Sequence, residues 1–217
     1  MAVNTILFDL DGTILNTIDD ISDSVNFALE KNGFPKRTLA EVRAFVGNGF
    51  NNLIHRALPS GTDGEPFEKC LASFKEHYKK NKTNKTSPYD GVPEMMRGLM
   101  ENGYKIAVVS NKQDDAVRAL SELFFSDCVS FALGSSDDAA KKPAPDMVYK
   151  ALSVLGSSVS EAVFIGDSEV DAETAKNANM PIIGVSWGFR GENILASAGI
   201  RHIARKPSDI PDIIKKL

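Results

Sequence analysis

The sequence is poor in the residues that cross-link extracellular proteins or bind transition metals: 217 residues include two cysteines, three histidines and one tryptophan. Cys70 and Cys128 are isolated and lie among apolar residues, which predicts reduced core cysteines rather than a disulfide or a metal site. His55, His77 and His202 are scattered without metal-ligand spacing. These scarcities exclude a disulfide scaffold and a zinc domain.

The chain also lacks an excess of positive charge and any long apolar run. Its formal net charge is −4, so we expect no general attraction to nucleic acid or to an anionic membrane. No apolar run approaches the length of a membrane span. The first predicted strand begins near residue 5 and leaves no room for a signal peptide, which favours a cytoplasmic protein.

Two nucleotide-binding signatures are missing as well. No Gly-x4-Gly-Lys-Ser/Thr run occurs, which excludes a phosphate-binding loop of that type. The glycine-containing segment Gly47-Asn48-Gly49 lacks the third glycine of a dinucleotide loop, and it follows a predicted helix rather than a strand.

The chain opens on an apolar run that ends in two aspartates, Asp9 and Asp11, followed by Gly12 and Thr13. Side chains two apart on an extended segment share a face, so both carboxylates can point into one pocket. Like charges at this distance need a proton or a cation between them. Oxygen ligands of this kind favour a hard divalent cation such as Mg²⁺. The alternative is that these aspartates only end a strand and cap a turn.

After this opening the pattern is helical to about residue 84 and alternates between strands and helices from residue 88 onward. Alternation of this kind predicts a doubly wound, parallel α/β sheet with right-handed crossovers. The first strand precedes the helical segment and the others follow it. We therefore predict a discontinuous α/β core, residues 1–15 and 85–217, with an inserted all-α domain at 16–84.

Ligands of an open parallel sheet bind beyond the carboxyl ends of its strands. The predicted strand 105–110 ends in Ser110 and is followed by Asn111, and the predicted strand 162–166 is followed by Asp167 and Asp171. Lys142 stands just before a proline, which restricts where it can point. Each of these residues alone has a plain structural explanation, such as a helix N-cap for Asp167. Together they predict one site at the sheet edge.

This set of motifs resembles the sequence motifs of the haloacid dehalogenase superfamily. The motifs match in order and in composition, and the resemblance spans nearly the whole chain. Asp9-Leu10-Asp11-Gly12-Thr13 looks like the aspartyl motif of its phosphatase branch, whereas dehalogenases carry an aromatic residue at the position of Asp11. The helical insertion is similar to the type 1 cap of the phosphoglycolate phosphatase-like group. Gly47-Asn48-Gly49 and Tyr89-Asp90-Gly91-Val92 look like that group in particular.

Residue chemistry predicts Asp9 as a nucleophile that becomes an aspartyl phosphate, and Asp11 as the acid and base of the two steps. The resemblance implies that Mg²⁺ is held by Asp9, by the backbone carbonyl of Asp11 and by the carboxylate of Asp167. Asp171 is expected behind them, orienting a water or Lys142.

The remaining predicted residues bind the substrate. Ser110 and the Asn111 N–H are expected to hold phosphoryl oxygens, Lys142 to neutralise the transferring group, and Thr13 to offer a hydroxyl. The resemblance implies that the inserted domain reads the rest of the substrate through Gly47-Asn48-Gly49.

The predicted activity is a Mg²⁺-dependent phosphomonoester hydrolase acting on a small phosphorylated metabolite, with 2-phosphoglycolate as the best single substrate. A phosphosugar mutase and a hydrolase of pyrophosphate or another small phosphate remain as alternatives with the same chemistry. A non-hydrolytic phospho-acceptor domain is a remote alternative, because such a domain is shorter and lacks the helical insertion. The sequence leaves the choice between a monomer and a homodimer open.

Overall fold

The computed structural model describes residues 3–136 and 140–217 and divides the chain into two compact units. The core unit comprises Met1–Leu15 and Pro88–Leu217, and the helical unit comprises Asn16–Ser87. The sequence predicts residues 16–84 for the insertion, so the structure carries it three residues further, to Ser87. Within the predicted core, residues 1–2 and 137–139 lie outside the described residues.

The core unit contains the predicted parallel sheet, with the strand order β5-β4-β1-β6-β7-β8. Each neighbouring pair is parallel, and β1 pairs with β4 and with β6. The first strand of the sequence therefore lies between two strands that come much later, as the discontinuous core requires. The strands are β1 (Thr5–Phe8), β4 (Lys105–Gln113), β5 (Phe131–Ser135), β6 (Ala162–Gly166), β7 (Ile182–Val185) and β8 (His202–Ala204).

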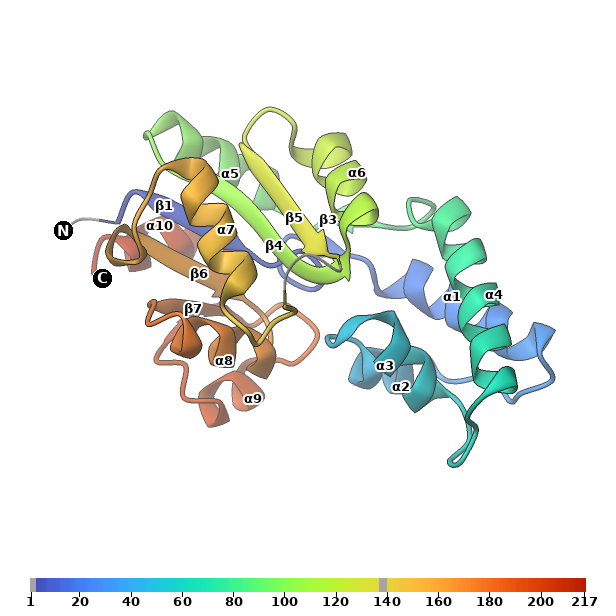
Figure 1. Ribbon diagram of the computed structural model, residues 1–217. Coiled ribbons are helices and arrows are strands. Elements are labelled where there is room, and N and C mark those ends of the chain that lie inside the picture. Colours follow the sequence, from blue (N-terminus) through green and yellow to red (C-terminus); the bar gives the residue numbers. More distant parts are fainter. Residues whose placement is uncertain (1–2, 137–139) are drawn as a thin grey trace. The chain divides into compact units, whose positions relative to one another are not determined.

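Helices cover both faces of this sheet, as Figure 1 shows. Alternation along β1 explains why: Ile6 and Phe8 pack into one apolar cluster, and Leu7 into the other. The first cluster takes in α5 (Val92–Glu101), α6 (Asp114–Phe125) and α10 (Ile210–Ile214), and the second takes in α7 (Asp146–Leu155) and α8 (Glu169–Asn177). The other elements of the core are α9 (Glu192–Ser197) and the short 3₁₀ segments η1 (Val159–Glu161) and η2 (Pro207–Asp209). The doubly wound α/β fold is confirmed.

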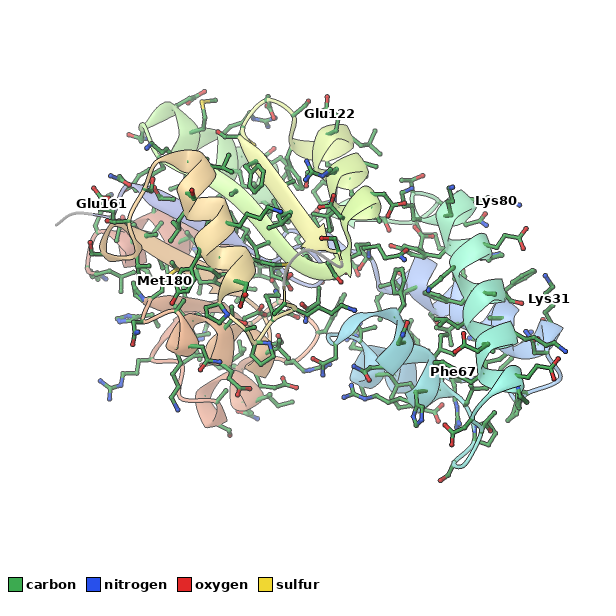
Figure 2. All side chains as sticks on the ribbon, in the orientation of Figure 1. Lys31, Phe67, Lys80, Glu122, Glu161 and Met180 are labelled. Carbon is green, nitrogen blue, oxygen red and sulfur yellow. The ribbon has the colours of Figure 1, made fainter. Side chains whose placement is uncertain are left out.

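The helical unit consists of α1 (Ile18–Lys31), α2 (Leu39–Phe45), α3 (Gly49–Ala57) and α4 (Glu65–Asn81). The apolar side chains of α1 recur at helical spacing and are buried, whereas Lys31 and Lys80, labelled in Figure 2, are exposed on α1 and α4. A capping box starts α2: the Glu41 N–H donates to Thr38 Oγ1 (3.3 Å), and the Thr38 N–H donates to Glu41 Oε2 (2.8 Å).

Three elements differ from what the sequence pattern predicts, and two short strands were not expected. Residues 128–133 are strand-like in sequence, but β5 begins only at Phe131, because the N–H groups of Cys128 and Val129 bond to the last turn of α6. The strand expected to end at Ser110 continues to Gln113. Residues 208–217 have a helical pattern in sequence, but they form the end of η2 followed by the short α10. The strands β2 (Leu15–Asn16) and β3 (Ser87–Pro88) were not expected; they pair with each other where the chain passes between units.

Two further expectations concern the cysteines and membrane-spanning helices. Cys70 and Cys128 are buried and free, as predicted, and burial raises the pKa of each thiol to about 11. No helix among the described residues is long and apolar enough to cross a membrane.

A buried carboxylate fixes the end of the helical unit. Asp20 on α1 is 1% exposed, and its two oxygens accept hydrogen bonds from the N–H groups of Lys85 (3.0 Å) and Thr86 (2.8 Å). The Thr86 hydroxyl donates to the same carboxylate (2.8 Å). The polar segment at Lys85 and Thr86 is therefore bound to the first helix of the unit.

This contact gives a stability prediction. Replacing Asp20 with alanine leaves two backbone donors and a hydroxyl without their charged acceptor, so Asp20→Ala should reduce the free energy of unfolding by about 3 kcal/mol. Chemical denaturation followed by circular dichroism measures the change. Asp23→Ala is the matched control, because Asp23 binds Lys85 Nζ in a half-exposed ion pair (2.7 Å) that should contribute little. Equal losses in the two variants would contradict the role of Asp20.

Candidate active site at the carboxyl edge of the core sheet

Most of the predicted site residues of the core unit lie at the carboxyl ends of three neighbouring strands, β1, β4 and β6, and Lys142 lies in the segment between β5 and α7. Asp9 comes directly after β1, and its N–H donates to the carbonyl of Ile165 on β6 (2.9 Å). This bond extends the β1–β6 pairing by one residue. The backbone of Asp9 is therefore fixed by the sheet itself.

The loop after β1 folds back tightly. The Leu10 carbonyl accepts the N–H groups of Thr13, Ile14 and Leu15, and Gly12 has a φ of +84°. A Cβ atom on Gly12 would overlap the carboxylate of Asp167, and one on Gly188 would overlap the same side chain. Only glycine lets both loops come this close to Asp167.

Three buried carboxylates meet at this edge. One oxygen each from Asp9, Asp167 and Asp171 lies within 4.8 Å of the others, and the three residues are 8%, 2% and 0% exposed. Asp167 accepts the Phe189 N–H (2.6 Å), while the residue that precedes α8 is Ser168. Asp167 therefore does not serve as the helix N-cap, and its carboxylate belongs to the cluster.

Lys142 joins two of these carboxylates. Its Nζ lies 2.9 Å from Asp9 Oδ1 and 2.7 Å from Asp171 Oδ1. The other Asp171 oxygen accepts the hydroxyl (2.6 Å) and the N–H (3.1 Å) of Ser168. The Asn111 side-chain amide bonds to both the N–H (2.8 Å) and the carbonyl (2.9 Å) of Lys142, so β4 anchors the backbone of this lysine.

Asp11 is paired with a residue that the sequence reasoning missed. Lys112 Nζ donates to both oxygens of Asp11, at 2.8 and 2.9 Å, and its side chain is fully buried. The signal was present, because Lys112 directly follows Ser110-Asn111 at a predicted site edge. The predicted strand ends at Ser110 and therefore does not include Lys112. Asp9 and Asp11 thus each bind a lysine of their own.

Burial sets the ionisation of the cluster. It raises the pKa of Asp9 from 3.8 to about 6, against the attraction of Lys142. Burial and the neighbouring carboxylates of Asp171 and Asp9 raise the pKa of Asp167 well above its usual range. Burial alone would lower the pKa of Lys142, but Asp171 and Asp9 outweigh it and raise that pKa.

The site is short of positive charge. With all four ionised, the carboxylates of Asp9, Asp11, Asp167 and Asp171 face two buried lysines, a net −2. Arg190 also acts on Asp167, but it is itself paired with Glu169 (3.2 Å). Buried charge of one sign is costly unless it is paired. A cluster of carboxylate oxygens with this deficit fits one hard divalent cation.

The remaining predicted residues have different surroundings. Thr13 is buried, its carbonyl accepts the Trp187 indole N–H (3.0 Å), and its Oγ1 has no hydrogen-bond partner among the described residues. Ser110 is also buried, and its Oγ accepts the Lys112 N–H at 3.4 Å. Gly47-Asn48-Gly49 belongs to the helical unit, around the start of α3, and its substrate contact stays a prediction.

Known proteins resemble the chain along nearly its whole length. A phosphoglycolate phosphatase of Nitrosococcus oceani is 33% identical over 189 residues, which cover 85% of this chain and 84% of the relative. One from Neisseria meningitidis serogroup A is 31% identical over 99% of this chain and 94% of its own. A crystal structure from Lactobacillus delbrueckii subsp. bulgaricus, provisionally assigned as a phosphoglycolate phosphatase, superposes with a TM-score of 0.95 at 32% identity over the full length of both chains.

The sequence pattern of one hydrolase family spans most of the chain as well, from residue 6 to residue 185. This range contains every core residue that the sequence analysis assigned to the site. The chain belongs to the haloacid dehalogenase-like hydrolases, and it is similar to members named phosphoglycolate phosphatase.

Proposed function

We propose that this chain is a Mg²⁺-dependent phosphomonoester hydrolase that acts through an aspartyl phosphate on Asp9, with 2-phosphoglycolate as its substrate. The observation that carries the proposal is the buried cluster of Asp9, Asp167 and Asp171 around Lys142. The relatives named phosphoglycolate phosphatase support the choice of substrate.

In the first step an Asp9 oxygen attacks phosphorus while the bond from phosphorus to the ester oxygen breaks. Asp11 enters this step in its protonated form and gives that proton to the departing alkoxide. Lys142, held between Asp9 and Asp171, neutralises charge on the transferring phosphoryl group. Thr13 Oγ1, which has no partner within the part of the chain that the structure describes, and the Ser110 hydroxyl are suited to phosphoryl oxygens, together with the Asn111 N–H.

In the second step water attacks the phosphorus of the aspartyl phosphate. The bond between phosphorus and the Asp9 oxygen breaks, inorganic phosphate forms, and Asp11 takes the proton of the attacking water. Asp9 returns as a carboxylate and Asp11 as an acid, so the cycle closes without another reactant.

The carboxylates of Asp9 and Asp167 and the backbone carbonyl of Asp11 would hold Mg²⁺. When bound, the ion supplies positive charge that offsets the net −2 of the cluster and the charge of the phosphoryl group. Asp171 keeps Lys142 in place behind these ligands.

A phosphate-release assay tests the activity. A panel of small phosphate esters with MgCl₂ should show the highest kcat/KM for 2-phosphoglycolate. Asp9→Asn should lower the rate by at least about 10³-fold, because the variant lacks its nucleophile. Circular dichroism should show that the variant stays folded. A fully active Asp9→Asn protein would refute the mechanism, whereas release only from pyrophosphate, or isomerisation of a sugar phosphate without release, would refute the substrate.

A second test uses pH. The folded, metal-free protein keeps the Asp9 proton up to about pH 6, whereas the ordinary carboxyl pKa is 3.8. This group therefore stabilises the metal-free fold at low pH, and the stabilisation is lost as pH rises through about 6. Mg²⁺ competes with the same proton, so saturating MgCl₂ should raise the melting temperature by about 5–10 °C near pH 7.5 and by much less near pH 5.

Thermal unfolding at both pH values, with and without MgCl₂, measures this difference. Asp167→Asn is the control variant, since it lacks one proposed ligand and should lose most of the shift. A shift of the same size at both pH values would contradict competition between the proton and the ion.

A further inference from the structure

The pairing of Asp11 with Lys112 links a loop to the sheet. Asp11 lies in the tight turn after β1, and Lys112 lies near the end of β4, the strand beside β1. The β1–β4 ladder ends at the pair Phe8 and Val108. Beyond it, both Asp11 oxygens accept hydrogen bonds from one ammonium group, at 2.8 and 2.9 Å.

This arrangement restricts the Asp11 carboxylate strongly. Two hydrogen bonds from one donor atom fix both oxygens, and with them the rotation of the side chain. The donor itself has little freedom, because the Lys112 side chain is completely buried and its backbone belongs to β4. The Lys112 N–H also donates to Ser110 Oγ (3.4 Å).

A role in stability alone explains the pair poorly. Burying a lysine costs free energy that its ion pair recovers only in part, and an apolar side chain of similar size is often as stable. The Asp11 side chain is 14% exposed, so it reaches the surface of the site while its partner does not. A buried ammonium group thus holds a carboxylate that is exposed to the site.

We propose that Lys112 is a positioning residue for Asp11: it holds the ionised carboxylate in the orientation from which Asp11 takes the proton of water, and the same orientation serves protonated Asp11 when it protonates the leaving group. The inference rests on the proposed function, and it names a residue that the sequence motifs did not assign. Proton transfer needs an Asp11 oxygen within hydrogen-bond distance of the leaving-group oxygen or of the attacking water. A misplacement of about 1 Å can lower the rate about 10²-fold.

The test variant is Lys112→Met, which keeps the buried alkyl chain and removes the ammonium. With 2-phosphoglycolate, kcat should fall about 100-fold while KM changes less than about threefold. Lys105→Met is the matched control, because Lys105 lies at the opposite end of the same strand and is exposed. It should keep the wild-type kcat.

A second substrate separates positioning from a structural role. p-Nitrophenyl phosphate has a leaving group that needs no proton, so in Lys112→Met the first step should persist while the second slows. Stopped-flow absorbance should then show a burst of nitrophenolate approaching one per active site, followed by slow turnover. Loss of both steps, with no burst, would mean that Lys112 supports the site as a whole, and would overturn the proposal.

A double-mutant cycle completes the test. Asp11→Asn combined with Lys112→Met should be no slower than Asp11→Asn alone, because Lys112 acts through Asp11. Additive losses would overturn the proposal, as would a wild-type kcat in Lys112→Met. If Lys112→Met does not fold, Lys112→Gln replaces it with the same expected pattern. If the wild-type protein releases no phosphate from any ester, the proposed function is refuted. If the wild-type enzyme is active but the variants show no burst, show additive losses or keep a wild-type kcat, only the role of Lys112 is refuted.

Discussion

The rest of the site depends on one electrostatic constraint: carboxylates outnumber buried cations at the carboxyl edge of the core sheet. Asp9, Asp167 and Asp171 lie within 4.8 Å of one another, and Lys142 neutralises only part of their charge. Burial and mutual repulsion raise the carboxyl pKa values of Asp9 and Asp167, which is the mark of a cluster that is incomplete without more positive charge. A divalent ion and a phosphoryl group, taken together, suit such a cluster.

The fold holds the charged groups of this site in fixed positions. Because β1, β4 and β6 are parallel neighbours, residues far apart in the sequence emerge at the same edge. Each charged group is then held by a second contact. Asn111 binds the backbone of Lys142, Ser168 binds Asp171, and the Phe189 N–H binds Asp167. Positions fixed in this way cost no reorganisation during phosphoryl transfer, which depends mainly on placement and charge.

The sequence predicted the parts of this site that follow from strand order. Asp9 and Asp167 could be expected together, because the carboxyl ends of parallel strands share an edge. Lys142 was added because the proline that follows it restricts where it can point. Lys112 was not included, because the predicted strand ended at Ser110, whereas β4 runs three residues further, to Gln113. The Asn111 amide was missed for a different reason: it bonds across 31 residues to a backbone that no local pattern locates. The contacts of Gly47-Asn48-Gly49 with substrate remain a prediction.

The most direct test of the charge argument is the position of the cation itself. Crystals grown with MnCl₂ in place of MgCl₂ should give one strong anomalous peak per chain, bounded by the carboxylates of Asp9 and Asp167 and the backbone carbonyl of Asp11, at metal–oxygen distances of about 2.1–2.3 Å. Asp167→Asn crystals should lose the peak or show it much weakened. A peak elsewhere on the chain, or none at this edge in the wild-type protein at saturating MnCl₂, would contradict the account.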